Sequence, residues 1–254
     1  MSYHTITYRV AGGVATVTLN RPRANNAVSI PLAQELTDAC SVINRDETIR
    51  VVIITGAGKV FSVGTDLPLK RGTSSASPRL PQAANAISRL HNPVIAAING
   101  DAIGQGLELA LAADIRIAAE TAHLGLPQVT SGLIPWDGGT QRLPRLVGRA
   151  RALEILLTGE MVTAAEAYCM GLVNKMVPLA ELPSVVAGIA QKIAASAPLA
   201  ARYAKEAVRQ GMDLTLEQGL RLETDLYLLL QTTADRTEGI TAFLEKRQPR
   251  FKGK

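Results

Sequence analysis

The sequence of 254 residues has few aromatic and few cysteine residues. Phe, Trp and Tyr together make up 4% of the chain, whereas hydrophobic residues make up 47%. A core of this composition must consist of aliphatic side chains and alanine. The two cysteines, Cys40 and Cys169, are too few for a disulfide framework, and we expect both to be reduced thiols.

Long hydrophobic runs are also lacking. No apolar run approaches the roughly 18 residues that a membrane-spanning helix needs. The first ten residues, MSYHTITYRV, do not show a charged segment followed by an apolar one, the pattern of a secretory signal. We therefore expect a cytoplasmic protein with no membrane partner.

Basic residues exceed acidic ones, 27 to 22, which leaves a formal net charge of +5. A basic surface suits either nucleic acid or a phosphorylated small molecule. The basic residues gather only modestly, in EKRQPRFKGK at 245–254, and no RNP-like motif, zinc knuckle or helix-turn-helix pattern accompanies them. We expect no nucleic-acid partner.

The first part of the chain predicts strands mixed with helices. Residues 4–10 and 14–20 alternate around AGG and predict a hairpin. Residues 30–46 have helical spacing, and 51–55 and 93–99 are short apolar strands that end in or before glycine. This order of strand, loop and helix predicts an α/β core.

The chain becomes mainly helical after about residue 140. Only 172–177 predicts a strand there, and the helical segments are 151–159, 163–171, 182–196, 198–211, 215–232 and 234–247. Several of them are apolar on more than one face, which indicates either a core or a subunit interface. We predict a core domain at 1–195 and a C-terminal helical region at 196–254.

The sequence does not match several common site motifs. GQGLEL has Leu109 where a dinucleotide fingerprint needs its third glycine, and GAGK lacks the other residues of a phosphate loop. The histidines have no metal-like spacing, and no serine or cysteine lies in a nucleophile-elbow context. We therefore expect no metal site and no covalent catalysis.

Two glycine-containing turns are better candidates for a functional site. FSVGTDL (61–67) and IGQGLEL (103–109) each combine an apparent strand end with glycine, which lets another molecule approach the backbone closely. Gln105 would lie in the first turn of a helix, whose N–H groups suit the developing oxyanion of a thioester. Glu108 lies where the apolar pattern of that helix points inward.

Five stretches together resemble the crotonase superfamily, and within it the enoyl-CoA hydratase/isomerase family. They occur in the family's order and cover essentially the whole chain, at 19–29, 51–67, 92–118, 132–160 and 234–247. The resemblance implies a crotonase (ClpP-like) α/β fold, with repeated ββα units in a spiral core and a helical C-terminal trimerisation region.

The resemblance also implies site residues at matching positions. The backbone N–H groups of Thr65 and Gln105 would form the oxyanion hole. Asp66 and Leu67 match the adenine and pantetheine contact segment, and Phe243 and Lys246 match CoA contacts from a neighbouring subunit. For Lys246, an ordinary solvated lysine on a helix is the alternative. The complete set of expected CoA and substrate contacts is Arg23, Ala24, Val63, Gly64, Asp66, Leu67, Ile103, Gly104, Trp136, Asp137, Phe243 and Lys246.

The expected catalytic residues are Glu108 and Gln128. Glu108 matches the first of the two glutamates that hydratases of this family use, and Gln128 stands where the second belongs. An amide can orient water but cannot exchange a proton at neutral pH. Asp137 follows Trp136, the position where some relatives carry an acting aspartate. A loop shift could bring Asp137 inward, or it could cap the following helix.

The resemblance implies an acyl-CoA enzyme, foremost an enoyl-CoA hydratase acting on a 2-enoyl- or dienoyl-CoA. The alternatives are a double-bond isomerase that uses one glutamate and a non-catalytic acyl-CoA binding protein. CoA would be part of the substrate, so we expect no separate cofactor. We expect a homo-oligomer, either a trimer or a dimer of trimers.

Overall fold

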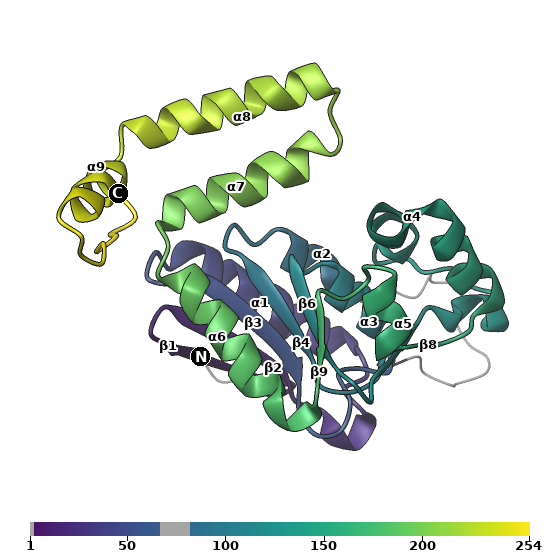
Figure 1. The fold of residues 1–254 in the computed structure, drawn as a ribbon. Helices are drawn as coiled ribbons and strands as arrows, with labels where there is room; N and C mark the ends of the chain where they lie inside the picture. Colours follow the sequence, from purple (N-terminus) through teal and green to yellow (C-terminus); the bar gives the residue numbers. More distant parts are fainter. Residues whose placement is uncertain (1–2, 67–81) are drawn as a thin grey trace.

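The computed structural model describes residues 3–66 and 82–254 (Figure 1). At its centre is a six-stranded sheet in the order β1-β2-β3-β4-β6-β9. The strands are β1 (Ile6–Ala11), β2 (Val14–Leu19), β3 (Val51–Gly56), β4 (Val94–Ile98), β6 (Ile115–Ala119) and β9 (Lys175–Val177). β1 and β2 form an antiparallel hairpin, and the other neighbours in this sheet pair in parallel. The predicted hairpin and the two predicted strands that became β3 and β4 are confirmed.

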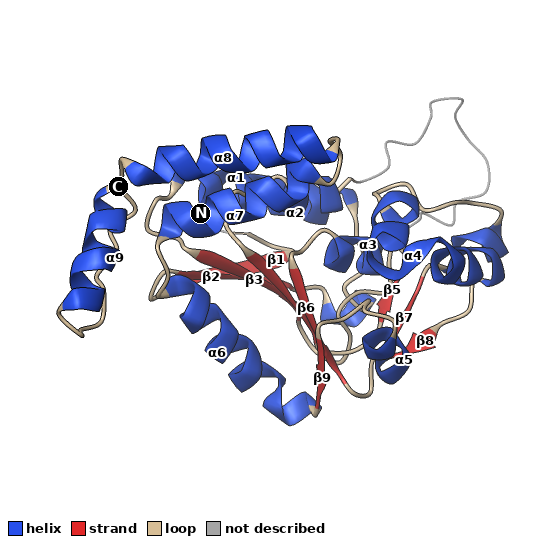
Figure 2. Cartoon of the chain, turned by 45° about the horizontal axis from the view of Figure 1, so that its top comes forward, coloured by secondary structure: helices blue, strands red, loops and turns tan. Residues whose placement is uncertain are grey.

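Different helices cover the two faces of this sheet. Because side chains alternate along a strand, Val52 and Ile54 of β3 join the larger core with α1 (Ile30–Arg45), while Val51 packs with α6 (Leu182–Ala194). Figure 2 shows α1 and α6 on opposite sides of the sheet. The buried face of α1 recurs every three or four residues, as its predicted spacing requires, at Leu32, Leu36, Ala39, Cys40 and Ile43.

A second, three-stranded sheet lies beside the first. It consists of β5 (Ala102–Ile103), β7 (His123–Gly125) and β8 (Val162–Thr163), in the order β5-β7-β8. α3 (Gln105–Leu111) begins two residues after β5, and α2 (Ala84–Ser88) packs near α3. This small sheet sets the position at which α3 begins. Its strands are too short to show an alternating pattern in the sequence.

The other helices follow in the second half of the chain. They are α4 (Gly139–Thr158), α5 (Ala164–Cys169), α7 (Pro198–Gly211), α8 (Leu216–Gln231) and α9 (Ala234–Leu244). Three short 3-10 helices are η1 (Pro22–Ala24), η2 (Pro127–Ser131) and η3 (Leu179–Glu181). α7, α8 and α9 project from the body of the molecule (Figure 1). Lys205 anchors α7 to the body through an ion pair with Asp114 of 2.8 Å. The division at residues 195 and 196 falls in the turn between α6 and α7, and it stays a prediction.

Two predicted boundaries were wrong. α4 begins at Gly139, not at 151, because the chain is helical on both sides of a break at Gly148, where φ is +76°. β9 begins at Lys175, not at 172, because the N–H groups of Leu172 and Val173 donate to the carbonyl of Ala167 at the end of α5.

Within the described residues, no single helix is both long enough and apolar enough to cross a membrane. The pair Leu179–Ala194 and Pro198–Gly211 reaches that length and hydropathy only when taken together, and its two helices are bent by 104°.

Candidate active site

The two glycine-containing turns lie side by side. Ser62 and Ala102 form an isolated parallel bridge between them. Gly64 has φ of +98° and Gly104 has φ of +54°, conformations that favour glycine. A Cβ atom on Gly64 would lie 2.9 Å from the Ile103 carbonyl oxygen and 3.3 Å from the Gln105 nitrogen. The absence of side chains therefore lets the backbone at Gly64 approach the start of α3.

Backbone hydrogen bonds fix the direction of the N–H group at the first of these turns. Val28 N–H donates to the Gly64 oxygen and Asp66 N–H donates to the Val28 oxygen, at 2.7 and 3.0 Å. In such a parallel bridge the N–H of the intervening Thr65 points away from Val28. Gln105 is the first residue of α3, as predicted, where N–H groups lie beyond the reach of the helix's own carbonyls. Two N–H groups from adjacent turns suit the polarisation of one carbonyl oxygen.

Glu108 lies one turn into α3 and is completely buried. Its Oε1 accepts hydrogen bonds from the N–H groups of Asp137 and Gly139, each at 2.8 Å. Its Oε2 has no hydrogen-bond partner among the described residues. Burial raises the pKa of Glu108 to about 7, although the two N–H donors act to lower it. A carboxyl group with one oxygen fixed, the other available and a pKa near neutrality can both take up and release a proton.

Gln128 and Trp136 contribute two further buried polar atoms. Nε2 of Gln128 would lie 3.5 Å from a Cβ on Gly104, so its amide lies against the turn that begins α3. Gln128 Oε1 and Trp136 Nε1 have no hydrogen-bond partner in the part of the chain that the structure describes. Buried polar atoms without partners are rare. Glu108 Oε2 and Gln128 Oε1 can therefore form hydrogen bonds to polar groups of a ligand at the start of α3.

Asp137 is buried, and it does not cap the following helix. α4 has Gly138 at its N-cap, with no capping side chain. Asp137 Oδ2 instead accepts hydrogen bonds from the N–H groups of Ala83 and Ala84, at 2.7 and 2.8 Å. The prediction that Asp137 caps α4 was therefore wrong: its carboxylate turns toward α2, an orientation set by tertiary contacts.

Arg142 is a site residue that the sequence analysis missed. Its Nη1 donates to the Asp137 carbonyl oxygen at 2.7 Å. Burial lowers the pKa of Arg142, while the charges of Asp137 and Glu108 act to raise it. The available signal was its position, because a cation in the first turn of a helix opposes the helix dipole and favours acidic neighbours.

The expected early CoA contact lies against the first glycine turn. Arg23 and Ala24 belong to η1, and the N–H of Val63 donates to the carbonyl oxygen of Asn25 immediately after it, at 3.2 Å. The structure thus brings together two segments that are about 40 residues apart in the sequence.

Asp66 is held by a residue that the sequence analysis did not single out. Arg21 Nη2 forms an ion pair with Asp66 Oδ2 at 2.8 Å, and Arg21 Nη1 donates to the Ala27 carbonyl oxygen. Leu67, the next expected CoA contact, lies outside the described residues.

Phe243 and Lys246 do not meet the other predicted site residues within this chain. Figure 1 shows α9 at one end of the molecule and α3 toward the other. Phe243 is 82% exposed. Lys246 lies two residues beyond the end of α9, at φ +55°, and is exposed, so the CoA contact from a neighbouring subunit and the ordinary solvated lysine both stay predictions.

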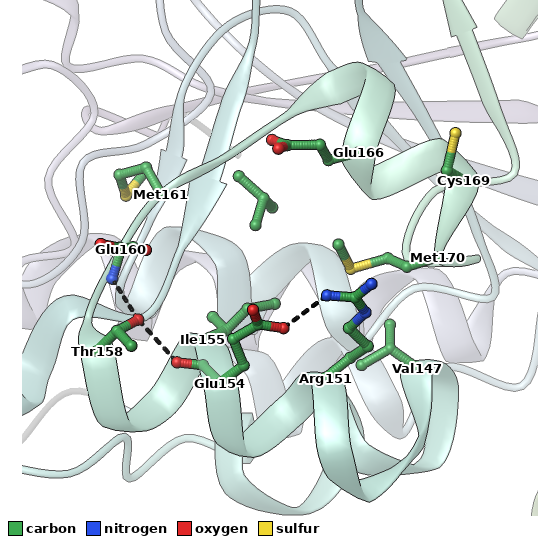
Figure 3. Close-up of a pocket in the computed structure, with 11 residues that line it drawn as sticks. Val147, Arg151, Glu154, Ile155, Thr158, Glu160, Met161, Glu166, Cys169 and Met170 are labelled. Atoms are coloured by element: carbon green, nitrogen blue, oxygen red, sulfur yellow. Dashed lines mark hydrogen bonds and ion pairs between the residues drawn. The ribbon is translucent and has the colours of Figure 1, made fainter.

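A separate hollow of about 400 Å³ lies between α4 and α5 (Figure 3). No described residue of the predicted site lines it. Arg151 on its wall is paired with Glu154 at 2.7 Å, and Glu166 accepts hydrogen bonds from Thr163. Its charged groups are thus largely satisfied by the protein itself.

Comparisons with known proteins agree over the whole chain. The family model for enoyl-CoA hydratase/isomerase matches residues 9–254. The crotonyl-CoA hydratase of Syntrophomonas wolfei is 40% identical, with 99% of each chain covered. The 2,3-dehydroadipyl-CoA hydratase of Escherichia coli is 41% identical, over 95% of this chain and 96% of its own length.

A solved structure supports the same assignment. The crystal structure of an enoyl-CoA hydratase from Bacillus anthracis superposes with a TM-score of 0.93 at 44% identity, covering 99% of this chain and 100% of that one. Sequence and fold therefore agree over their full lengths, and this chain belongs to the enoyl-CoA hydratase/isomerase family, as an enzyme with the crotonase fold.

Proposed function

We propose that this enzyme adds water to the double bond of a 2-enoyl-CoA or dienoyl-CoA. The observation that carries the proposal is the state of Glu108. It is completely buried, one oxygen is fixed by two backbone N–H groups, and the other has no partner among the described residues. Its pKa of about 7 suits a group that must both accept and donate a proton.

The proposed reaction uses one carboxylate for both proton transfers. Glu108 takes a proton from water while the water oxygen bonds to the β-carbon and the double-bond electrons move to the thioester oxygen. The N–H groups of Thr65 and Gln105 hold the resulting enolate. Glu108 then returns the proton to the α-carbon, so the product gains one hydrogen and one hydroxyl group. The Gln128 amide orients the water, because an amide can hydrogen-bond but cannot carry the proton.

An isomerase is the second candidate, and one observation favours it. Gln128 leaves this site with one carboxylate of the two that hydration uses in the family. A single glutamate suffices to move a proton from the α- to the γ-carbon of a 3-enoyl-CoA. A non-catalytic acyl-CoA binding protein is the third candidate, and the buried, proton-active Glu108 argues against it.

Incubation with two substrates separates the three candidates. A hydratase converts crotonyl-CoA to 3-hydroxybutyryl-CoA. An isomerase converts a 3-enoyl-CoA to the 2-enoyl-CoA and leaves crotonyl-CoA unchanged, and a binding protein changes neither. We expect hydration of crotonyl-CoA. Binding without turnover of either substrate would contradict an enzymatic role.

We further propose that the CoA portion binds along Arg23, Ala24, Asp66 and Leu67. The contact between η1 and the Val63 segment supports this path. Phe243 and Lys246 would complete the site from a neighbouring subunit, because they lie far from α3 within one chain (Figure 1). A trimer, or a dimer of trimers, would supply that neighbour.

An apolar groove supports a subunit contact in this region. It has a volume of about 460 Å³ and lies where α7, α8 and α9 meet. Apolar side chains dominate its lining, among them Leu199, Tyr227, Leu230, Ile240, Phe243 and Phe251. The cytoplasmic location expected from the sequence stays a prediction.

A further inference from the structure

Asp137 contacts the two halves of the proposed catalytic apparatus. Its backbone N–H donates to Glu108 Oε1 at 2.8 Å. Its side-chain Oδ2 accepts a hydrogen bond from Gln105 Nε2 at 3.0 Å. One residue thus touches the proposed acid–base group and a residue of the proposed oxyanion hole. Only 5% of the Asp137 surface is exposed.

The contact with Gln105 continues to the other proposed oxyanion residue. Thr65 Oγ1 donates to Gln105 Oε1 at 2.9 Å. The side chains of Thr65, Gln105 and Asp137 therefore form one hydrogen-bonded line, which links the two glycine turns to the loop before α4. Since a backbone N–H moves with its own residue, this line restrains the N–H groups of Thr65 and Gln105 relative to Glu108.

Asp137 is itself held from a third direction. Ala83 and Ala84, at the start of α2, donate their N–H groups to the same Oδ2 atom that Gln105 contacts. Three donors on one oxygen fix the carboxylate more firmly than one would. The start of α2 therefore fixes the Asp137 carboxylate, and the carboxylate in turn orients the Gln105 side chain.

We propose that Asp137 is a positioning residue that couples the oxyanion hole to Glu108. The inference rests on the proposed function, because it concerns how that site is held in register. Asp137 takes no proton in this scheme: its carboxylate aligns Gln105, and its negative charge acts on Glu108. The line of Thr65, Gln105 and Asp137 makes the site's geometry depend on a side chain that takes no part in the proton transfer.

The electrostatic part of the coupling has a definite sign. The charge of Asp137 raises the pKa of Glu108, and the charge of Arg142 lowers it. Among the described residues, these are the charged groups that face Glu108, one from the loop before α4 and the other from α4 itself. Removal of the Asp137 charge should therefore lower the pKa of Glu108.

Two substitutions test the proposal, since both keep the backbone N–H that binds Glu108. Asp137→Ala removes the carboxylate that accepts a hydrogen bond from Gln105 Nε2, and kcat for crotonyl-CoA hydration should fall about 10-fold. KM should change little, because the proposed CoA contacts lie elsewhere. Asp137→Asn keeps an oxygen but removes the charge, so the limb of the kcat profile set by Glu108 should move to lower pH.

A double-mutant cycle tests the side-chain line. If Gln105 and Asp137 act through one hydrogen bond, Gln105→Ala should cost little more in Asp137→Ala than the single substitution already does. Asp114→Asn is the matched control, because Asp114 also accepts a backbone N–H, from Val94 at 2.7 Å, but lies beyond the C-terminal end of α3, at the opposite end from Gln105. It should lower thermal stability and leave kcat and the pH profile unchanged. Additive losses, or an unmoved pH limb in Asp137→Asn, would overturn the proposal.

A measurement without substrate separates this inference from the proposed function. The titration of Glu108 can be followed by carbon-13 NMR of labelled glutamate, with Glu108→Gln to assign the signal. A lower pKa in Asp137→Asn supports the coupling even if the wild-type enzyme leaves crotonyl-CoA unchanged. An unchanged pKa contradicts the coupling even if the wild-type enzyme is a hydratase.

Discussion

The burial of Glu108 in an apolar core prepares its carboxyl group for the proposed acid–base role. Desolvation disfavours the ionised carboxylate, and the N–H groups of Asp137 and Gly139 only partly offset this effect. The group therefore titrates near neutrality instead of near its ordinary value of 4.5. This state arises mainly from burial, and the charge of Asp137 adds to it.

The raised pKa has a consequence for stability. A carboxyl whose folded-state pKa is raised contributes its full stabilisation below about 4.5 and loses it as the pH rises through about 7. Glu108→Gln mimics the protonated form at every pH. We expect the variant to gain unfolding free energy over wild type on going from pH 5 to pH 8, by on the order of 1–3 kcal/mol. Urea unfolding at both pH values measures this difference, and a constant offset would contradict the raised pKa.

A substitution at Gln128 distinguishes the two candidate activities, hydratase and isomerase. Gln128→Glu would place a second carboxylate beside the water, and repulsion from Glu108 would raise at least one of the two pKa values. If the site is a weakened two-carboxylate hydratase, crotonyl-CoA hydration should rise measurably in this variant. The assay should run beside isomerisation of a 3-enoyl-CoA. A variant that hydrates no better and isomerises as wild type does would favour the isomerase.

The turn between β5 and α3 is the element on which the site depends. A Cβ on Gly106 would lie 2.2 Å from the Ser62 carbonyl oxygen, where the two glycine-containing turns pack against each other. Gly106→Ala should therefore lower the unfolding free energy by about 1–3 kcal/mol and impair turnover.

Gly188→Ala is the control for that substitution. Gly188 also lies within a helix, α6, but a Cβ there would meet nothing within 4 Å. Because alanine favours helix more than glycine does, stability should rise by up to about 1 kcal/mol. Equal effects of the two substitutions would contradict the importance of the close approach.

The predictability of the elements depends on their length and on the range of their contacts. The hairpin, α1, β3 and β4 have clear periodicities and were predicted within a few residues. β5, β7 and β8 span only two or three residues, which leaves no period to detect.

The site was only partly predictable, because some of its contacts join residues that are far apart in the sequence. Gln105 at the start of α3 follows from local glycine chemistry and was expected. Its contact with Asp137 spans 32 residues and depends on how the loop before α4 folds onto α2. The direction of the Asp137 side chain could not be derived from its neighbours in sequence.

At the scale of the whole molecule, the C-terminal helices leave large apolar side chains exposed. Leu216, Phe243 and Leu244 are exposed by 80%, 82% and 73% of their surfaces. We expect these exposed apolar side chains on α8 and α9 to be covered by a neighbouring subunit. We expect sedimentation at micromolar concentration to give a trimer or a dimer of trimers. A stable monomer that is fully active would contradict both the oligomer and the proposed role of Phe243 and Lys246.

In the proposed mechanism, Glu108 carries the protons of the reaction. The most direct measurement is the rate of crotonyl-CoA hydration by wild type and Glu108→Gln, with folding and CoA binding verified for both. We expect the wild-type enzyme to hydrate crotonyl-CoA and the variant to lose at least about 100-fold in kcat, since general acid–base groups contribute that much or more. Near-wild-type turnover in the variant would contradict this mechanism and would place the proton-transfer group elsewhere, with Asp137 the next residue to test.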